Sequence, residues 1–131
     1  MLVLILKCDN LTLFSKEFIL IMDQVKDFNK AGSIIRTGRS FGIDGYFAVD
    51  SYFDPFDKKA IEASSGLVFS CDFRLFPDDE HLIENIIKKS YQIITNSPNG
   101  ESLESLVEFS DKPVALVIGS EPESATDKYI D

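Results

Sequence analysis

The residues Phe18-Ile19-Leu20-Ile21-Met22 form an uninterrupted apolar run that ends at Asp23. Such a run is typical of a strand that is buried on both faces, as the central strands of parallel sheets are. A loop follows, and the spacing of apolar residues then predicts a helix from about Ala31 to Phe41, with Gly42 as its stop signal. This strand-loop-helix unit indicates an α/β fold.

The rest of the chain repeats the alternation of short apolar runs with longer amphipathic segments. Strands are expected at 46–49, 91–95 and 114–118, and a weaker strand at 67–76, where Cys71-Asp72 interrupts the run. Helices are expected at 54–63, with Pro55 in the first turn, at 78–89, and around 103–107. We therefore expect an open, mostly parallel sheet of about five strands with helices on both of its faces.

The composition is that of one globular domain. The chain has 131 residues, of which 44% are hydrophobic and 11% aromatic, so it can bury a core without disulfides or metal. Two distant cysteines, Cys8 and Cys71, and the single His81 make no zinc motif. Cys71 is expected to be a small buried hydrophobe, and His81 to face solvent. The apolar run Met1–Leu6 is too short for a membrane span or a signal peptide, which predicts a cytoplasmic protein without a membrane partner.

Charge is distributed unevenly along the chain. The total of 13 Lys+Arg against 22 Asp+Glu, a net charge of −9, argues against nonspecific binding to nucleic acid and against DNA as a partner. Acids concentrate between Asn99 and Asp131, whereas bases gather between Lys26 and Arg39, the one stretch suited to an anion. Ligands of parallel sheets bind where loops leave the carboxyl ends of strands, here after Met22, Thr95 and Ile118.

Three segments carry a family resemblance. The first comprises Asp23-Gln24-Val25-Lys26-Asp27, Ala31-Gly32-Ser33-Ile34-Ile35-Arg36-Thr37 and Ser40-Phe41-Gly42-Ile43-Asp44-Gly45. The second is Val117-Ile118-Gly119-Ser120-Glu121, and between them lie Asp54-Pro55 and the residues from Ala63 to Phe69. Together they resemble the first motif, the second motif and the connecting segment of the SpoU/TrmH family of RNA ribose 2′-O-methyltransferases, over about residue 18 to the C-terminus.

The resemblance implies a SPOUT-like α/β knot, a homodimer, S-adenosyl-L-methionine as methyl donor, and the ribose hydroxyl of an rRNA or tRNA as acceptor. It assigns catalysis to Arg36, which would also contact RNA, with Glu121 in support. Lys30 and Arg39 would be further RNA contacts. The donor site would be lined by Thr95, Asn96, Ile118, Gly119 and Ser120, and no metal is implied.

These residue types suit that chemistry. A 2′-hydroxyl is a weak nucleophile, so it needs a proton acceptor or a charge that stabilises the developing alkoxide. Arg36 is always charged and can bind a phosphate with two parallel hydrogen bonds. Gly119 lets the main chain approach a ligand without a Cβ in the way. Without the motifs, Arg36 would be a solvated surface residue and Glu121 a helix-capping acid.

The sequence also departs from the family pattern. Alignment on Gly32 and Arg36 puts Lys30 where the family has Asn, with Asn29 one place early; a slip of one residue would bring Asn29 to that position and change the shape of the loop. Pro122 follows the second motif where a Gly-rich turn is usual. A last Ser-Leu-Asn-Val motif, on the segment that forms the knot, is absent before Asp131. We expect residues 18–131 to be a SpoU-type domain truncated before that motif, as a fragment or a degenerate relative. Residues 1–17 would be a stub or an edge strand.

Two other functions fit the residues. The domain could be a non-catalytic RNA-binding or dimerisation module that kept the sheet and lost the cofactor. Such a module would bind RNA with a steep salt dependence but would not bind S-adenosyl-L-methionine. A flavodoxin-like domain that binds another anion after Met22 is a third reading.

Overall fold

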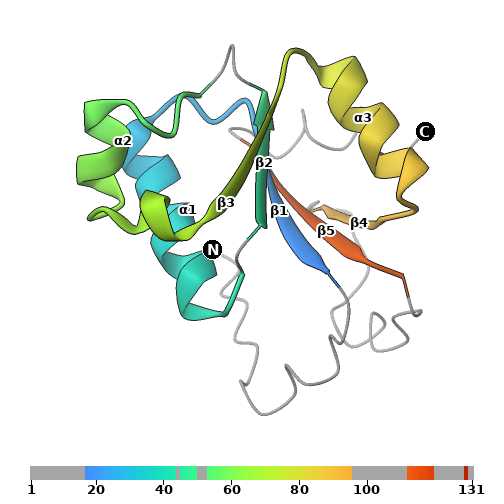
Figure 1. Ribbon diagram of the computed structural model, residues 1–131, viewed down its shortest axis with the longest axis horizontal. Coiled ribbons are helices and arrows are strands. Elements are labelled where there is room, and N and C mark those ends of the chain that lie inside the picture. The colour runs from blue at the N-terminus through green and yellow to red at the C-terminus, as the bar shows by residue number, and fades with distance from the viewer. Residues whose placement is uncertain (1–16, 44, 50–52, 96–111, 120–128, 130–131) are drawn as a thin grey trace.

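Five parallel strands form the sheet, in the order β3-β2-β1-β5-β4 (Figure 1). The computed structural model describes residues 17–43, 45–49, 53–95, 112–119 and 129. Within them, the prediction of a parallel five-stranded sheet is confirmed. The strands are β1 (Phe18–Asp23), β2 (Gly45–Val49), β3 (Asp72–Phe76), β4 (Gln92–Thr95) and β5 (Val114–Gly119).

The strand order contains one topological switch point. From the central β1 the chain proceeds outward to β2 and β3, then crosses to β4 at the opposite edge and returns through β5, which pairs with β1. In register, Asp23 lies beside Gly119 and Thr95 beside Val117, so β1, β4 and β5 end at one edge of the sheet. Open parallel sheets bind ligands at such an edge, in the crevice at the switch point, which here lies between β1 and β5.

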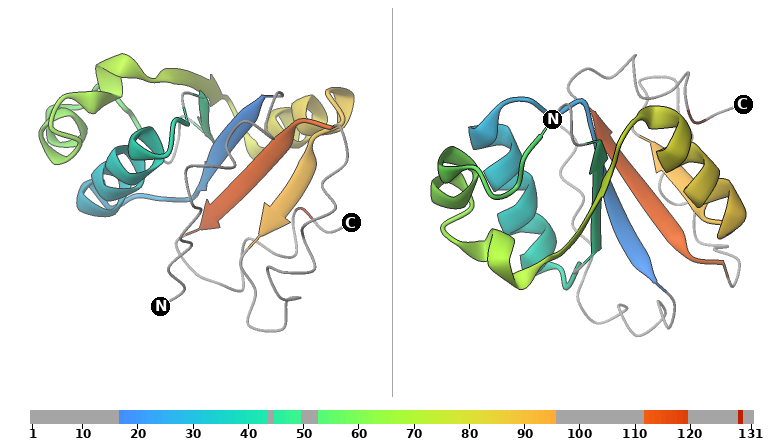
Figure 2. Two further views of the ribbon diagram at one scale, coloured as in Figure 1. Left: turned by 90° about the horizontal axis from the view of Figure 1, so that it is seen from below. Right: turned by 45° about the horizontal axis from the view of Figure 1, so that its top comes forward.

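Helices cover both faces of the sheet, as predicted. Figures 1 and 2 show α1 (Phe28–Ser40) and α2 (Lys58–Ala63) on one side and α3 (Asp79–Lys88) on the other. Alternate residues of β1 point to opposite faces. Leu20 packs in the core beneath α1, and Ile21 packs in the core beneath α3. All of Ile19–Asp23 is buried, which is why the run shows no polar alternation.

Helix α1 approaches its neighbours very closely at two glycines. A Cβ at Gly32 would overlap the main chain of Ala63 at the end of α2, and one at Gly38 would overlap the Tyr46 hydroxyl on β2. That hydroxyl lies 3.3 Å from the carbonyl oxygen of Ile35, and burial raises its pKa well above the usual range. Small residues therefore set the distance between α1, α2 and the sheet.

Three predicted elements differ from the structure by more than one residue in their bounds. The strand predicted at 67–76 is wrong in its first half, where Leu67–Ser70 forms a 3-10 helix, η2. Gly66 lies in the left-handed region (φ 78°) and the Ser64 hydroxyl accepts a hydrogen bond from Val68 N–H, so the chain turns there before β3 begins. The remaining two differences concern the starts of α1 and α2.

Both helix starts follow from aspartate caps. Helix α1 begins at Phe28 rather than near Ala31 because Asp27 caps it. Helix α2 begins at Lys58, capped by Asp57, whereas Asp54 and Pro55 belong to the preceding turn. The helix expected around 103–107 and the turn at 96–100 lie outside the described residues. Within the described ranges, no helix is long and apolar enough to cross a membrane.

Candidate functional site

The turn that leaves β1 at the switch point is held in an uncommon backbone conformation. Gln24 has a φ of 52°, in the left-handed region that costs a non-glycine residue about 1 kcal/mol. On either side of it, Asp23 is only 2% exposed and Val25 is fully buried. Burial of these two neighbours therefore fixes the path of the chain from β1 into α1.

Helix α1 begins at this turn with a side-chain cap. The Asp27 carboxylate accepts hydrogen bonds from the backbone N–H of Asn29 (2.8 Å) and of Lys30 (3.4 Å). Such caps satisfy N–H groups that have no partner within the helix. The first turn of α1 contains no acidic residue, and the capped turn carries the Lys30 side chain at the edge of the sheet.

Lys30 bridges the switch point. Its Nζ donates a hydrogen bond of 3.0 Å to the carbonyl oxygen of Gly119, the last residue of β5. This bond joins the two segments that resemble the first and second family motifs, 89 positions apart in the sequence. Lys30 was predicted as an RNA contact. The structure places its ammonium, still exposed to solvent, against the main chain at the predicted donor site.

The two arginines of α1 have different surroundings. Arg36 is exposed, about 9 Å along the helix axis from Lys30. Arg39 is half-buried, and its positive charge acts on the Tyr46 hydroxyl and the Cys71 thiol, lowering the pKa of both against the larger effect of burial. Arg36 is thus accessible to a large ligand, whereas Arg39 turns partly toward the β2 side.

The predicted donor-site residues are only partly described. Thr95 at the end of β4 and Ile118 and Gly119 at the end of β5 are half-buried. Ile118 also packs against the core beneath α1. The remaining predicted residues, Asn96, Ser120 and Glu121, lie outside the described ranges, so their roles stay predictions.

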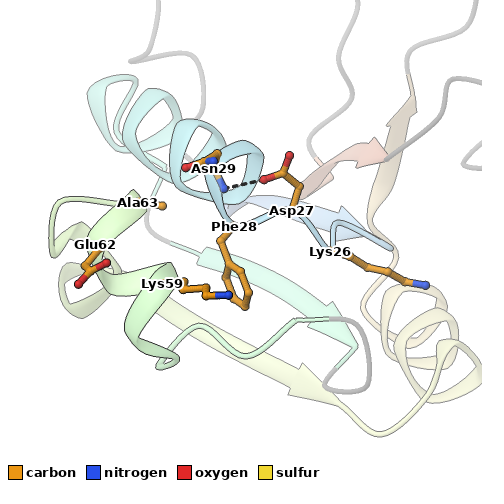
Figure 3. Close-up of a pocket in the computed structure, with 7 residues that line it drawn as sticks. All are labelled: Lys26, Asp27, Phe28, Asn29, Lys59, Glu62 and Ala63. Atoms are coloured by element: carbon orange, nitrogen blue, oxygen red, sulfur yellow. Dashed lines mark hydrogen bonds between the residues drawn. The ribbon is translucent and has the colours of Figure 1, made fainter.

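A cavity of about 510 Å³ lies beside this site, between the start of α1 and helix α2 (Figure 3). Figure 3 shows Lys59 on the same side as the Phe28 ring, while Lys26 extends away from it. The sequence analysis missed the α2 side of this cavity because no periodic signal shows that α2 packs against α1. The lining residues are Lys26, Asp27, Phe28, Asn29, Lys59, Glu62 and Ala63.

His81 and Cys71 lie where no catalytic role is indicated. His81 is exposed, as predicted, and its Nδ1 lies 2.7 Å from Oδ1 of Asp78, the residue that caps α3. Cys71 is half-buried, its Sγ 3.3 Å from the Leu67 carbonyl, and burial raises its pKa, opposite to what a nucleophile needs. Among the described residues, no group of three or more His, Cys, Asp or Glu is placed to hold a metal ion.

The comparison with known families decides the identity. The model of the SpoU rRNA Methylase family matches residues 17–131, which includes every described residue. The chain belongs to the SpoU rRNA methylase family. The family prediction made from the two motifs is therefore confirmed.

Individual relatives agree with this assignment. A 23S rRNA (adenosine(1067)-2′-O)-methyltransferase of Streptomyces azureus is 32% identical over 85% of this chain and 41% of its own length. An uncharacterized tRNA/rRNA methyltransferase of Archaeoglobus fulgidus is 30% identical over 79% of this chain and 46% of its own. The chain thus spans less than half the length of these relatives.

Solved structures show the same fold. An rRNA methyltransferase from Sinorhizobium meliloti superposes with a TM-score of 0.68 at 27% identity, over 79% of this chain and 39% of that one. An AdoMet-bound rRNA methyltransferase from the same organism gives a TM-score of 0.62 at 25% identity, over 80% and 40% of the two chains. The α/β sheet and its helices are therefore those of SpoU methyltransferases.

Proposed function

We propose that this SpoU chain supplies the catalytic domain of an S-adenosyl-L-methionine-dependent RNA ribose 2′-O-methyltransferase that acts on rRNA or tRNA. The observation that carries the proposal is the Lys30 Nζ to Gly119 carbonyl bond, which brings the two motif segments together at the switch point of the sheet. The 2′-O-methyltransferase of Streptomyces azureus supports the reaction type.

The residues at this edge fit the methyl donor. Ile118 and Thr95 are half-buried there and offer an apolar surface and a hydroxyl, while Gly119 presents main chain without a side chain. The AdoMet-bound relative from Sinorhizobium meliloti supports this choice of cofactor. When bound, S-adenosyl-L-methionine supplies a methyl group that its sulfonium already activates, so the protein need not activate it.

In this proposal the exposed Arg36 binds an RNA phosphate and stabilises the negative charge that develops on the ribose oxygen. Glu121 would support it at the end of the second motif. Lys30 and Arg39 would add smaller contacts to RNA, Arg39 less because it is half-buried. Assembly as a homodimer is proposed from the resemblance alone.

Arginine variants test this role. Arg36→Ala removes both the phosphate contact and the charge, so we expect methyl transfer from a labelled donor to total rRNA or tRNA to fall at least a hundredfold. Arg36→Lys keeps the charge, so methyl transfer should fall less in this variant. Lys88→Ala on α3, which lies on the opposite face of the sheet, is the control and should leave transfer unchanged.

A non-catalytic RNA-binding module is the second candidate, favoured by the lysine that stands where the family has an amide. If the chain is such a module, its RNA binding should weaken steeply with salt and in Arg36→Ala. Titration with S-adenosyl-L-methionine should release no heat. Donor binding in the titration excludes this module, whereas RNA binding without donor binding overturns the enzyme proposal.

A further inference from the structure

The cavity between α1 and α2 is lined by an aromatic ring that other rings hold in place. Phe28 is half-buried, and its ring lies in the cavity with Lys59 on the same side (Figure 3). The ring centroid of Phe28 is 6.0 Å from that of Phe53, which is only 3% exposed. Phe53 in turn contacts Phe73 at 6.4 Å, and Phe73 stacks on the buried Tyr46. This row of four rings holds Phe28 as an apolar surface inside a mostly polar cavity.

Hydrogen-bonding groups of both kinds surround the Phe28 ring. Lys59 supplies an ammonium donor, Glu62 a carboxylate acceptor and Asn29 an amide that does both, and all three residues are exposed. The lining contains two lysines and two acids, so charge alone does not select a phosphate. A flat ring with donors and acceptors along its edge fits such a lining, and a nucleobase is a ring of this kind.

The size and the position of the cavity agree with such a ligand. Its volume of about 510 Å³ lies within the range of small-molecule pockets, roughly 300–1,000 Å³. Asn29, which lines the cavity, and Arg36 are separated by about two turns of α1. They therefore share one face of the helix, about 10.5 Å apart along its axis. One RNA strand can contact both of them.

We propose that this cavity binds an unpaired nucleobase of the RNA strand whose phosphate Arg36 holds. Phe28 would be the stacking surface, and Lys59 and Asn29 would bond to the edge of the base. The inference rests on the proposed function and adds base recognition to it. Unpaired bases are bound in this way because they expose both a π-face and a hydrogen-bonding edge. A base held beside α1 limits which ribose of the strand reaches the switch point.

A purely structural role for Phe28 makes a different prediction. If the ring only packs against Phe53, its loss lowers stability and leaves RNA binding as it was, or loosens every RNA contact alike. The proposal requires the loss of a contribution that comes from bases alone. An abasic RNA backbone keeps the phosphates and riboses, so the ratio of the affinities for an ordinary strand and for its abasic counterpart isolates that contribution.

Fluorescence anisotropy of the full chain tests the proposal with two probes, a single-stranded RNA of mixed sequence and an abasic RNA backbone of the same length. Phe28→Leu keeps an apolar side chain but removes the aromatic face. We expect its affinity for the mixed-sequence RNA to fall about fivefold to twentyfold, and its affinity for the abasic backbone to stay within about twofold. Arg36→Ala should weaken the binding of both probes and reduce its salt dependence, because a phosphate contact is lost.

Phe69→Leu is the matched control for the aromatic ring. It makes the same substitution at a ring that is 66% exposed and does not line the cavity, so both affinities should stay unchanged. An equal loss of affinity in Phe69→Leu and Phe28→Leu would mean that exposed rings bind bases wherever they lie, which overturns the cavity as the site.

Lys59→Met tests the edge of the base. The substitution keeps the length of an exposed side chain and removes its donor. We expect the ratio of the two affinities to fall about twofold to fivefold, because one hydrogen bond to the base is lost. If Lys59 acted only as a charge near the phosphates, both affinities would fall alike, the ratio would not change, and its assigned role would be wrong.

The outcomes separate this proposal from the proposed function. Equal ratios in wild type and folded Phe28→Leu overturn the cavity proposal, as does a wild type that binds neither probe, whereas the proposed function fails only if methyl transfer to total rRNA or tRNA is absent. Free adenosine that binds as tightly as RNA, and more weakly to Phe28→Leu, would make the ligand a separate nucleoside and overturn the assignment to RNA. Far-UV circular dichroism shows whether each variant is folded, and if Phe28→Leu is not, the ratio in Lys59→Met decides.

Discussion

Helices α1 and α3 begin in the same way and yet carry opposite charges. Each is capped by an aspartate, Asp27 on one face of the sheet and Asp78 on the other. The first turn of α3 then holds Asp79 and Glu80, which complement the positive end of the helix dipole, whereas the first turn of α1 holds no acid and carries Lys30. The first turn of α1, which faces the switch point, therefore lacks the stabilising acids that the first turn of α3 has. Such a loss of helix stability is expected where residues are placed to bind a ligand.

The largest expected effect on stability concerns the packing of α1 against α2. Gly32→Val on α1 would force side-chain atoms into the main chain of Ala63, and we expect it to lower the free energy of unfolding by about 3 kcal/mol. The control is Ser33→Val, which adds the same side chain at the adjacent exposed position. Urea titration of both variants measures the difference. Equal midpoints would mean that α1 and α2 are not in close contact.

The cap of α1 is the next largest effect. Asp27→Ala leaves the N–H groups of Asn29 and Lys30 without their acceptor, and we expect a loss of about 1 kcal/mol in the free energy of unfolding. It should also weaken donor binding, because the hydrogen bond from Lys30 to the Gly119 carbonyl, which joins α1 to the end of β5, then starts from a less fixed turn. Asp78→Ala is the matched control because it removes the cap of α3, and it should leave ligand binding unchanged. Equal effects of the two variants on binding would remove the functional distinction between the helices.

The charge contrast can be reduced by one substitution. Asn29→Glu places an acid in the exposed first turn of α1, and the helix dipole should then raise the free energy of unfolding by about 0.5 kcal/mol. RNA binding should weaken at the same time, because the added charge repels phosphate. Glu80→Gln on α3 should lower stability slightly without any effect on RNA. A stabilised Asn29→Glu that binds RNA as well as wild type would argue against α1 as the RNA-facing helix.

The smallest effect concerns pH and belongs to α3 alone. The Asp78 carboxylate raises the pKa of His81 above 6.5, and hydrogen bonds from His81 lower the pKa of Asp78 below 3.8. The contribution of His81 to the free energy of unfolding is therefore complete below pH 6.5, and it is lost as the pH rises through the pKa of His81 in the folded protein. That of Asp78 is complete above pH 3.8 and is lost as the pH falls through its folded pKa.

Nuclear magnetic resonance of the single histidine measures this directly. The pKa of His81 should lie above 6.5 in the wild type and should fall in Asp78→Asn. The stability difference between wild type and His81→Gln should be largest between about pH 4 and pH 6.5. A His81 pKa that does not respond to Asp78→Asn would show that the pair does not form in solution.

The sequence predicted the parts of the fold that depend on local pattern. The run Phe18–Met22 and the run at 114–118 became β1 and β5, because strands buried on both faces must be apolar at every position. The helix at 78–89 was found almost to the residue because its cap and its charged ends agree. The motifs were sufficient to identify the family.

Other features could not be predicted because they depend on distant neighbours. No local pattern indicates that Lys30 reaches Gly119, since strand order alone brings them together. Arg39 reads as a surface residue and is half-buried because α1 sits so close to Tyr46. The start of α1 at Phe28 could have been found, since Asp27 is a strong capping residue, but the apolar spacing from Ala31 dominated the prediction.

The position of β5 in the sheet also governs how the chain folds during synthesis. Strand β4 pairs with β5, and the second edge of β1 pairs with β5 as well, so both must wait for β5, which leaves the ribosome after the other four strands that the structure describes. Until then β1 exposes an apolar edge to other nascent chains, which is a template for aggregation. Folding of these five strands is therefore slow and cooperative, because one late strand must insert between two early ones.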